Sequence, residues 1–263
     1  MSATGVAVRS ADASTATVFA RAASAEWLRL RTVRTTWWCL LAAAVTIVGI
    51  GATAAFDEAQ GPAGPGSTLP ATLAGEFGVL PGQFALLVLA LLAVTQEHAT
   101  GMIGPTLQWT PRRGVLLAAR VAVPVAVATV AGVLLALVTD VAAWFIAPGL
   151  TLSLADLADS LGRIAAVLAA GSLLAVGLGL LLRSTAGALA TVFLLQLVLP
   201  FLLPAFDVAW MRDLGRVLPG SGAIWTLLGE PDMTAVLATT VLAGWSAAAL
   251  AGGGWSLLRR DAG

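Results

Sequence analysis

Few side chains in this sequence could carry out chemistry, and they do not form a catalytic constellation. His98 is the only histidine and Cys39 the only cysteine among 263 residues, which excludes an internal disulfide and a zinc site of usual spacing. His98 follows Glu97, and the pair could relay a proton, although an interfacial hydrogen-bonding role is the more common one. There is no lysine, and therefore no G-x-x-x-x-G-K-[ST] phosphate-binding loop. We therefore predict that this chain is not an enzyme, hydrolyses no ATP by itself, and has no metal or cofactor of its own.

The composition indicates a membrane protein. Hydrophobic residues make up 59% of the chain and charged residues 11%, and the mean hydropathy is +0.93. A soluble domain has about 25% charged residues, so this chain lacks the polar side chains needed to cover a water-facing surface. The formal net charge is zero, which gives no support for a nucleic-acid partner.

Six hydrophobic segments are long enough to cross a bilayer, which takes about 20 apolar residues. They cover approximately 37–56, 79–96, 119–139, 161–182, 187–206 and 235–257. Pro81 and Gly82 suggest an irregular entry to the second segment, and the residues RSTAG form a tight turn between the fourth and fifth. We therefore predict an all-α integral membrane protein with a six-span domain at 37–258 and a short tail at 259–263.

The placement of arginine predicts how the spans are oriented. If both termini are cytoplasmic, eleven arginines lie inside and three, Arg163, Arg212 and Arg216, lie outside. Cytoplasmic loops carry an excess of basic residues, so we expect a multi-pass protein of the plasma membrane with both termini in the cytoplasm. Residues 1–18 are small and polar and lack the apolar core of a signal peptide. We interpret them as a disordered tail.

Three further features belong to this layout. Segment 207–234 is partly apolar and rich in Pro and Gly, which fits either half-helices re-entering the bilayer or an ordinary surface loop. Asp140 ends the third span, where it either lines an exit vestibule or is simply solvated. Gln196 is the most central polar side chain and could hydrogen-bond to a second copy. Because mid-span charges are lacking, an ion-coupled secondary transporter is disfavoured.

The segment 19–36 precedes the first span and has the pattern of a basic amphipathic helix lying along the inner leaflet. Its apolar stripe comprises Phe19, Ala22, Ala23, Leu30, Val33 and Trp37. Glu26 interrupts that stripe, and either pairs with Arg29 three residues later or marks a contact with protein rather than lipid. The candidate contact residues of this interface helix are Glu26, Trp27, Arg29, Arg31 and Arg34. A plain membrane anchor is the alternative interpretation.

The segment 97–113, EHATGMIGPTLQWTPRR, is the long polar interruption in the first half of the chain. A connection between antiparallel spans needs only a few residues, so its length calls for an explanation. A short helix crossing the inner face with its apolar residues half buried would account for the composition, and apolar patches rimmed by polar groups usually mark a protein interface. Alternatively, these residues pack beneath the bundle while the arginines anchor lipid headgroups. The residues alone are compatible with both.

Three stretches resemble one family. Residues 97–113 follow the pattern Glu-x-x-Thr-Gly-Met-Ile-x-x-Thr-Leu-x-x-x-Pro-Arg-Arg, similar to the loop between the second and third spans of type 2 ATP-binding-cassette (ABC) transporter permeases. The stretch SAEWLRLRTVRTTWW at 24–38 resembles the segment before the first span in actinobacterial members. LPGSGA at 218–223 is similar to their last external segment.

The resemblance implies a half-transporter, expected to be an exporter, that pairs with a second permease copy, as a homodimer or heterodimer, and with a cytoplasmic ABC ATPase subunit that binds the ATP. Segment 97–113 would then contain the coupling helix on which the ATPase docks, beside the interface helix. The candidate coupling residues are Glu97, Thr100, Gly101, Met102, Ile103, Leu107, Pro111, Arg112 and Arg113. The apolar inner faces of the first, second and fifth spans favour a hydrophobic or amphipathic substrate. The alternative is a non-transporting membrane anchor or regulatory subunit.

Overall fold

The computed structural model describes residues 14–60, 69–100, 113–206, 208–229 and 233–260, and all regular elements in this part of the chain are helices, without strands. In chain order the elements are α1 (Thr15–Thr32), α2 (Arg34–Gln60), α3 (Thr72–Thr100), α5 (Arg113–Ile146), α6 (Leu154–Leu182), α7 (Thr185–Phe193), the π-helix η1 (Leu194–Val198), α8 (Leu199–Ala205), α9 (Ala209–Arg216), α10 (Pro219–Leu228) and α11 (Ala235–Arg260). Pro70 and Thr151 form one isolated bridge between two connections.

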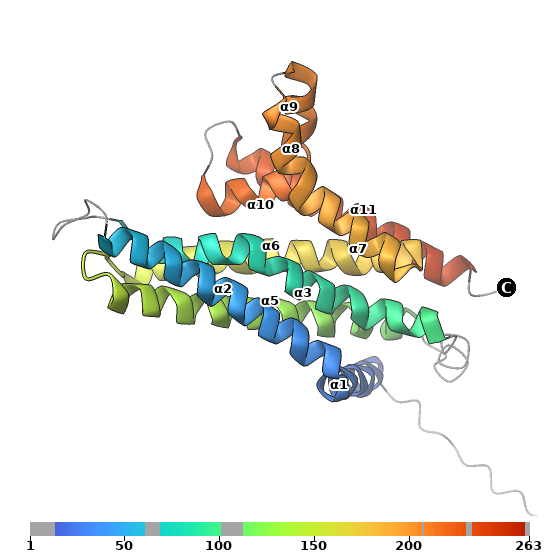
Figure 1. Ribbon diagram of the computed structural model, residues 1–263. Helices are drawn as coiled ribbons and strands as arrows, with labels where there is room; N and C mark the ends of the chain where they lie inside the picture. The colour runs from blue at the N-terminus through green and yellow to red at the C-terminus, as the bar shows by residue number, and fades with distance from the viewer. Residues whose placement is uncertain (1–13, 61–68, 101–112, 207, 230–232, 261–263) are drawn as a thin grey trace, which may run out of the picture.

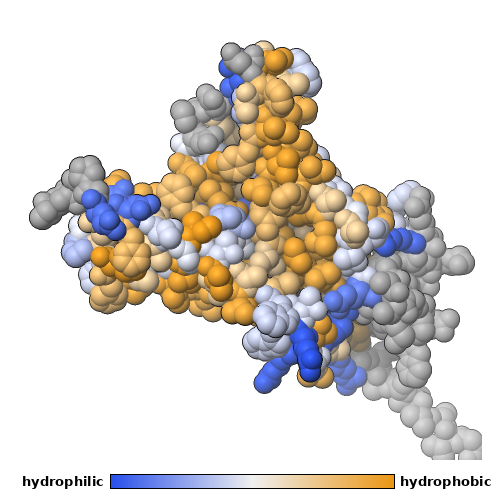
Figure 2. Space-filling view, viewed as in Figure 1, coloured by the Kyte–Doolittle hydropathy of each residue, from blue (hydrophilic) through white to orange (hydrophobic). Residues whose placement is uncertain are grey.

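Six of these helical stretches are long and apolar enough to span a membrane. They are Arg34–Gln60, Thr72–Gln96, Gly114–Ile146, Leu154–Leu182, Thr185–Ala205 and Ala235–Ser256. The fold is therefore consistent with a multi-pass membrane protein, and the predicted spans correspond to these helices. The observed helices are longer than the predicted spans because they continue beyond the hydrophobic windows. In the space-filling view, hydrophilic side chains gather toward the ends of the helices, and an apolar surface lies between them (Figure 2).

The spans run antiparallel, and α3 and α6 lie at the centre of the bundle (Figure 1). The start of α2, the ends of α3, α6 and α11 and the start of α5 lie together with α1, and we call this the basic end. The opposite end carries the start of α3, the end of α5 and the start of α6, and we call it the acidic end. Helices α8 and α9 project away from the bundle (Figure 1).

The irregular entry expected at Pro81 and Gly82 is wrong, because α3 continues through Pro81 without a break. Close packing against α2 accounts for this continuity. A Cβ atom on Gly78 would lie 2.3 Å from the Ile47 carbonyl oxygen, and one on Gly82 would lie 2.3 Å from the Ile47 side chain. Small residues four apart allow two membrane helices to approach this closely. Helices α2 and α3 therefore pack closely on both sides of Pro81.

The turn between the fourth and fifth spans is as tight as the sequence suggests. Arg183 ends α6 in the left-handed conformation, with φ 54°, and its backbone N–H donates to the Gly179 carbonyl. Ser184 then caps α7, because its hydroxyl accepts from the Gly187 N–H. One residue thus ends the first helix and the next begins the second.

The fifth span is interrupted by the π-helix, and the interruption has a local cause. Pro200 has no backbone N–H, so the carbonyl of Gln196 loses its usual partner four residues later. Helix α10 packs against this carbonyl so closely that a Cβ atom on Gly220 would lie 2.2 Å from it. The described part of segment 207–234 contains two short helices, α9 and α10, and α10 is largely buried against the bundle.

Candidate functional site

The candidate site lies at the basic end, where α1 packs mainly on α5. Helix α1 begins after Ser14, whose hydroxyl accepts from the Thr17 N–H. It ends at Val33, which is extended, and α2 begins immediately at Arg34. The expected single helix over 19–36 is therefore displaced toward the N-terminus and broken at Val33. The Trp37 indole donates to the Arg31 carbonyl over 3.0 Å. This bond gives a partner to a carbonyl in the last turn of α1.

The face of α1 that packs against the bundle includes Ala22, Ala23, Leu30 and Val33 of the predicted apolar stripe, together with Glu26. Glu26 is only 6% exposed and Leu30 only 5%, while Phe19 and Trp37, at the two ends of that stripe, are 37% and 57% exposed. The acidic residue that interrupted the stripe is thus at the centre of the packed face. Of the two interpretations of Glu26, the contact with protein is confirmed, and so is the pair with Arg29.

A buried ion network holds α1 in place. The Glu26 carboxylate pairs with Arg29 through one oxygen, and its other oxygen lies 3.3 Å from Nε of Arg120, on α5. Arg120 is only 3% exposed. Arg29 also donates to the backbone carbonyl of Ala93, on α3. Charges this far from water persist only when they are paired and hydrogen-bonded, so the network requires α1, α3 and α5 to stay together.

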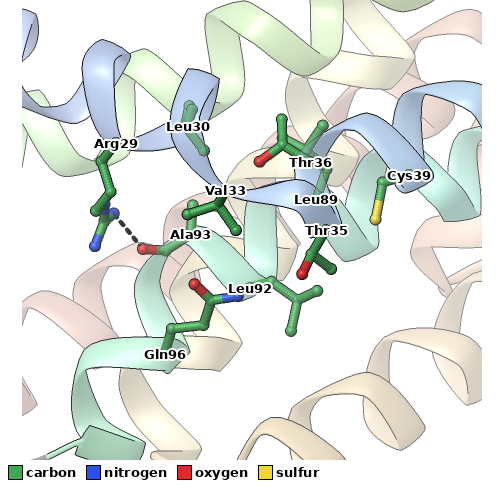
Figure 3. A pocket seen from close by; sticks show the side chains of 10 residues that line it. All are labelled: Arg29, Leu30, Val33, Thr35, Thr36, Cys39, Leu89, Leu92, Ala93 and Gln96. Carbon is green, nitrogen blue, oxygen red and sulfur yellow. Dashed lines mark hydrogen bonds between the residues drawn. The ribbon is translucent and has the colours of Figure 1, made fainter.

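The elbow between α1 and α2 encloses a small cavity beside this network (Figure 3). Leu30 and Val33 line it from one side, Cys39 and Leu89 from the other, and Arg29 reaches across it to Ala93. Its volume of about 10 Å³ is at most that of one water molecule. The elbow is therefore a packed joint between helices rather than a ligand pocket.

The network is placed symmetrically around segment 101–112. Ala93 precedes the end of α3 at Thr100 by seven residues, and Arg120 follows the start of α5 at Arg113 by seven. At 1.5 Å per residue this is about 10 Å of helix on each side. Helix α1 is thus attached to both helices that lead into the segment.

The predicted coupling residues fall mostly outside the described residues. Glu97 and Thr100 belong to the last turn of α3 and Arg113 is the first residue of α5, but their side chains are not among the described ones. Gly101, Met102, Ile103, Leu107, Pro111 and Arg112 lie outside the described residues altogether. The role predicted for this group stays a prediction.

The interface-helix candidates divide into a packed set and an exposed set. Glu26 is buried and Arg29 half-buried, whereas Trp27, Arg31 and Arg34 are exposed. The exposed three leave a surface with an aromatic ring and two guanidinium groups at the basic end. Sequence reasoning missed Arg120, and its only signal was an isolated arginine seven residues into an apolar segment.

The acidic end has a second ion network, which contains one buried carboxylate. Glu76, which is 1% exposed, accepts from Nη2 of Arg163 over 2.7 Å. Nε of Arg163 also lies 3.1 Å from the Asp159 carboxylate, and its Nη1 donates to the carbonyls of Thr226 and Leu227 at the end of α10. One arginine therefore joins α3, α6 and α10.

The expectation that Asp140 is either solvated or lines a vestibule is wrong. Its side chain is fully buried, and Oδ1 accepts from the Gly75 N–H over 2.8 Å. Gly75 lies in the first turn of α3, where N–H groups are short of acceptors and the helix dipole favours a carboxylate. Asp140, on α5, therefore stabilises the start of α3 by accepting this hydrogen bond.

Comparison of the chain with models of known protein families gives no match, and comparison with curated proteins gives none either.

Proposed function

We propose that this chain is the membrane-spanning permease subunit of an ABC transporter, working as a dimer with a separate cytoplasmic ATPase. In this proposal the basic end faces the cytoplasm of a plasma-membrane protein, in keeping with the excess of arginine there. The ATPase subunit docks on segment 97–113 together with the exposed side of α1. The chain acts as an exporter of a hydrophobic or amphipathic substrate.

The single observation that best supports this proposal is the Glu26 network. A docking surface can transmit movement only if it is rigidly joined to the spans that must move. Helix α1 is joined to α3 through Arg29 and Ala93 and to α5 through Arg120. A displacement of the surface at α1 would therefore be transmitted to the second and third spans together.

A plain anchor would have no need of this attachment. An amphipathic anchor helix buries apolar side chains in the acyl boundary and keeps its charged groups in water. In α1 the buried face carries a carboxylate paired with two arginines. This arrangement favours a fixed structural element over a lipid anchor and thereby the permease over the anchor interpretation.

The experiment that tests the proposal is a pull-down of the tagged chain from its native membrane in mild detergent, with mass spectrometry of the co-purifying proteins. The variant Arg112→Glu/Arg113→Glu reverses charge at the proposed docking segment. Arg216→Glu serves as the control at the opposite end, since the exposed pair of Arg216 with Asp213 contributes little to stability. We expect an ABC ATPase with the native chain and the control, and none with the double variant. An ATPase absent from all three refutes the proposal in favour of an anchor.

A further inference from the structure

A groove runs between α3 and α7, near the middle of the second span and in the first half of the fifth. It has a volume of about 330 Å³, and its eight lining residues are all aliphatic or aromatic. Leu87 and Leu91 of α3 and Val192 of α7 lie at its base and are at most 3% exposed. The groove is therefore a depression in the side of the bundle with a well-packed floor.

One end of the groove is closed by an aromatic contact. The rings of Phe84 and Phe193 meet edge to face, with centroids 5.6 Å apart and an interplanar angle of 70°. From this contact one wall of the groove extends along α3 to Leu91, and the other extends along α7 to Leu189. Seven residues of helix correspond to about 10 Å, so the depression is elongated along the spans.

We propose that this groove binds one acyl chain of a membrane phospholipid. Both walls belong to helices that qualify as spans, so wherever no second copy covers the groove it opens to the hydrocarbon of the bilayer. Its lining side chains offer no hydrogen-bonding group, and burying a charged or polar headgroup there would be unfavourable. A flexible hydrocarbon chain entering from the side matches both the lining and the elongated shape.

The groove is too small to enclose a helix of a second copy, which could fill it only with side chains while packing over it. An α-helix with its side chains is about 10 Å wide, which gives a cross-section of about 80 Å². A volume of 330 Å³ would then hold about 4 Å of helix, which is less than the 5.4 Å pitch of one turn. A second copy could reach into the groove only with single side chains.

The test uses the purified chain in nanodiscs of phosphatidylcholine that contain a trace of phosphatidylcholine with a diazirine in its acyl chain. After illumination, mass spectrometry locates the cross-linked lipid. Exposed positions on α5, namely Val130, Leu134 and Val138, report the labelling expected from ordinary contact with the bilayer. The ATPase is not needed, so the result is independent of the proposed function.

Two matched variants probe the groove. Ala190→Phe fills it from an exposed position on α7, and Ala186→Phe adds the same ring one turn earlier, at an exposed position that does not line the groove. We expect labelling of 84–91 and 189–193 several-fold above the α5 positions in the native chain and in Ala186→Phe. In Ala190→Phe it should fall to the α5 level.

Three results would overturn the proposal. Groove labelling equal to that of α5 in the native chain would mean that no chain is held there. Labelling unchanged by Ala190→Phe would place the lipid elsewhere. Protein–protein cross-links at 189–193 that are lost in Ala190→Phe would show that a second copy fills the groove instead.

Discussion

The buried Glu26 network allows a quantitative prediction about how firmly α1 is held. Replacing Glu26 with alanine removes its carboxylate from beside Arg120, which is only 3% exposed. Breaking a buried ion pair in this way costs about 3–5 kcal/mol. Undocking of α1 separates Arg120 from position 26 in any case, so the cost applies to the docked state alone. At about 1.4 kcal/mol per factor of ten, even the lower figure raises the undocked fraction roughly a hundredfold.

Limited proteolysis of the purified chain measures this fraction. Trypsin cleaves after Arg31 only when α1 opens, and in the regime where opening is fast the rate follows the population of the open form. We expect Glu26→Ala to be cleaved roughly a hundredfold faster than the native chain. Ser24→Ala is the control, because the Ser24 hydroxyl is exposed and donates only to the Ala20 carbonyl of its own helix.

A double substitution separates the loss of the charge pair from the loss of packing. Glu26→Leu combined with Arg120→Met removes the charges of this buried pair and keeps the volume, while the half-buried Arg29 keeps its bond to the Ala93 carbonyl. Apolar replacements of buried ion pairs are often neutral or stabilising. We expect cleavage of the double variant within a few-fold of the native rate. Equal cleavage of Glu26→Ala, Ser24→Ala and the native chain would refute the reasoning, because the network would then contribute nothing to docking.

Two further predictions concern the packing of the spans and the acidic end. Gly51→Ala should lower the thermal unfolding temperature in detergent, because its Cβ would lie 2.1 Å from the Thr139 side chain. The control Gly49→Ala meets no atom within 4 Å and should be neutral or raise stability by up to ~1 kcal/mol through helix propensity. Equal effects of the two substitutions would contradict the close packing at Gly51. Arg163→Met should destabilise the fold by about 1–3 kcal/mol because it removes the arginine beside the buried Glu76; the cost stays below that of a fully buried pair because the Arg163 side chain is 36% exposed. The addition of Glu76→Leu should restore most of the loss in the same thermal assay. A double variant no more stable than Arg163→Met would contradict the pairing.

The six spans could be predicted from the sequence because hydropathy is a local property that a window of residues already contains. The break at Val33 was less accessible, since amphipathic periodicity continues across it into α2. The pairing of Glu26 with Arg120 joins residues 94 positions apart, and only the packing of α1 on α5 brings them together. Periodicity placed Glu26 on the correct face but gave no means of choosing its distant partner.

Asp140 shows why burial at helix ends is difficult to predict. An acid near the end of a span is usually hydrated, and the local sequence supports that expectation. Here the start of α3 lies against the side chain and supplies a backbone donor from Gly75. The environment of Asp140 thus depends on where another helix begins, which the residues around position 140 do not encode.

The contacts at the two ends also indicate which span is least restrained. At the basic end Glu26 ties α1 to α5, and at the acidic end Arg163 ties α6 to α3 and α10. Residues 185–205 contain no charged side chain, so the fifth span cannot join either network. It also contains the π-helix, and the buried amide of Gln196 has no hydrogen-bond partner among the described residues. If the permease proposal is correct, the fifth span is therefore the element whose displacement breaks the fewest polar contacts, while α1, α3 and α5 move as one unit.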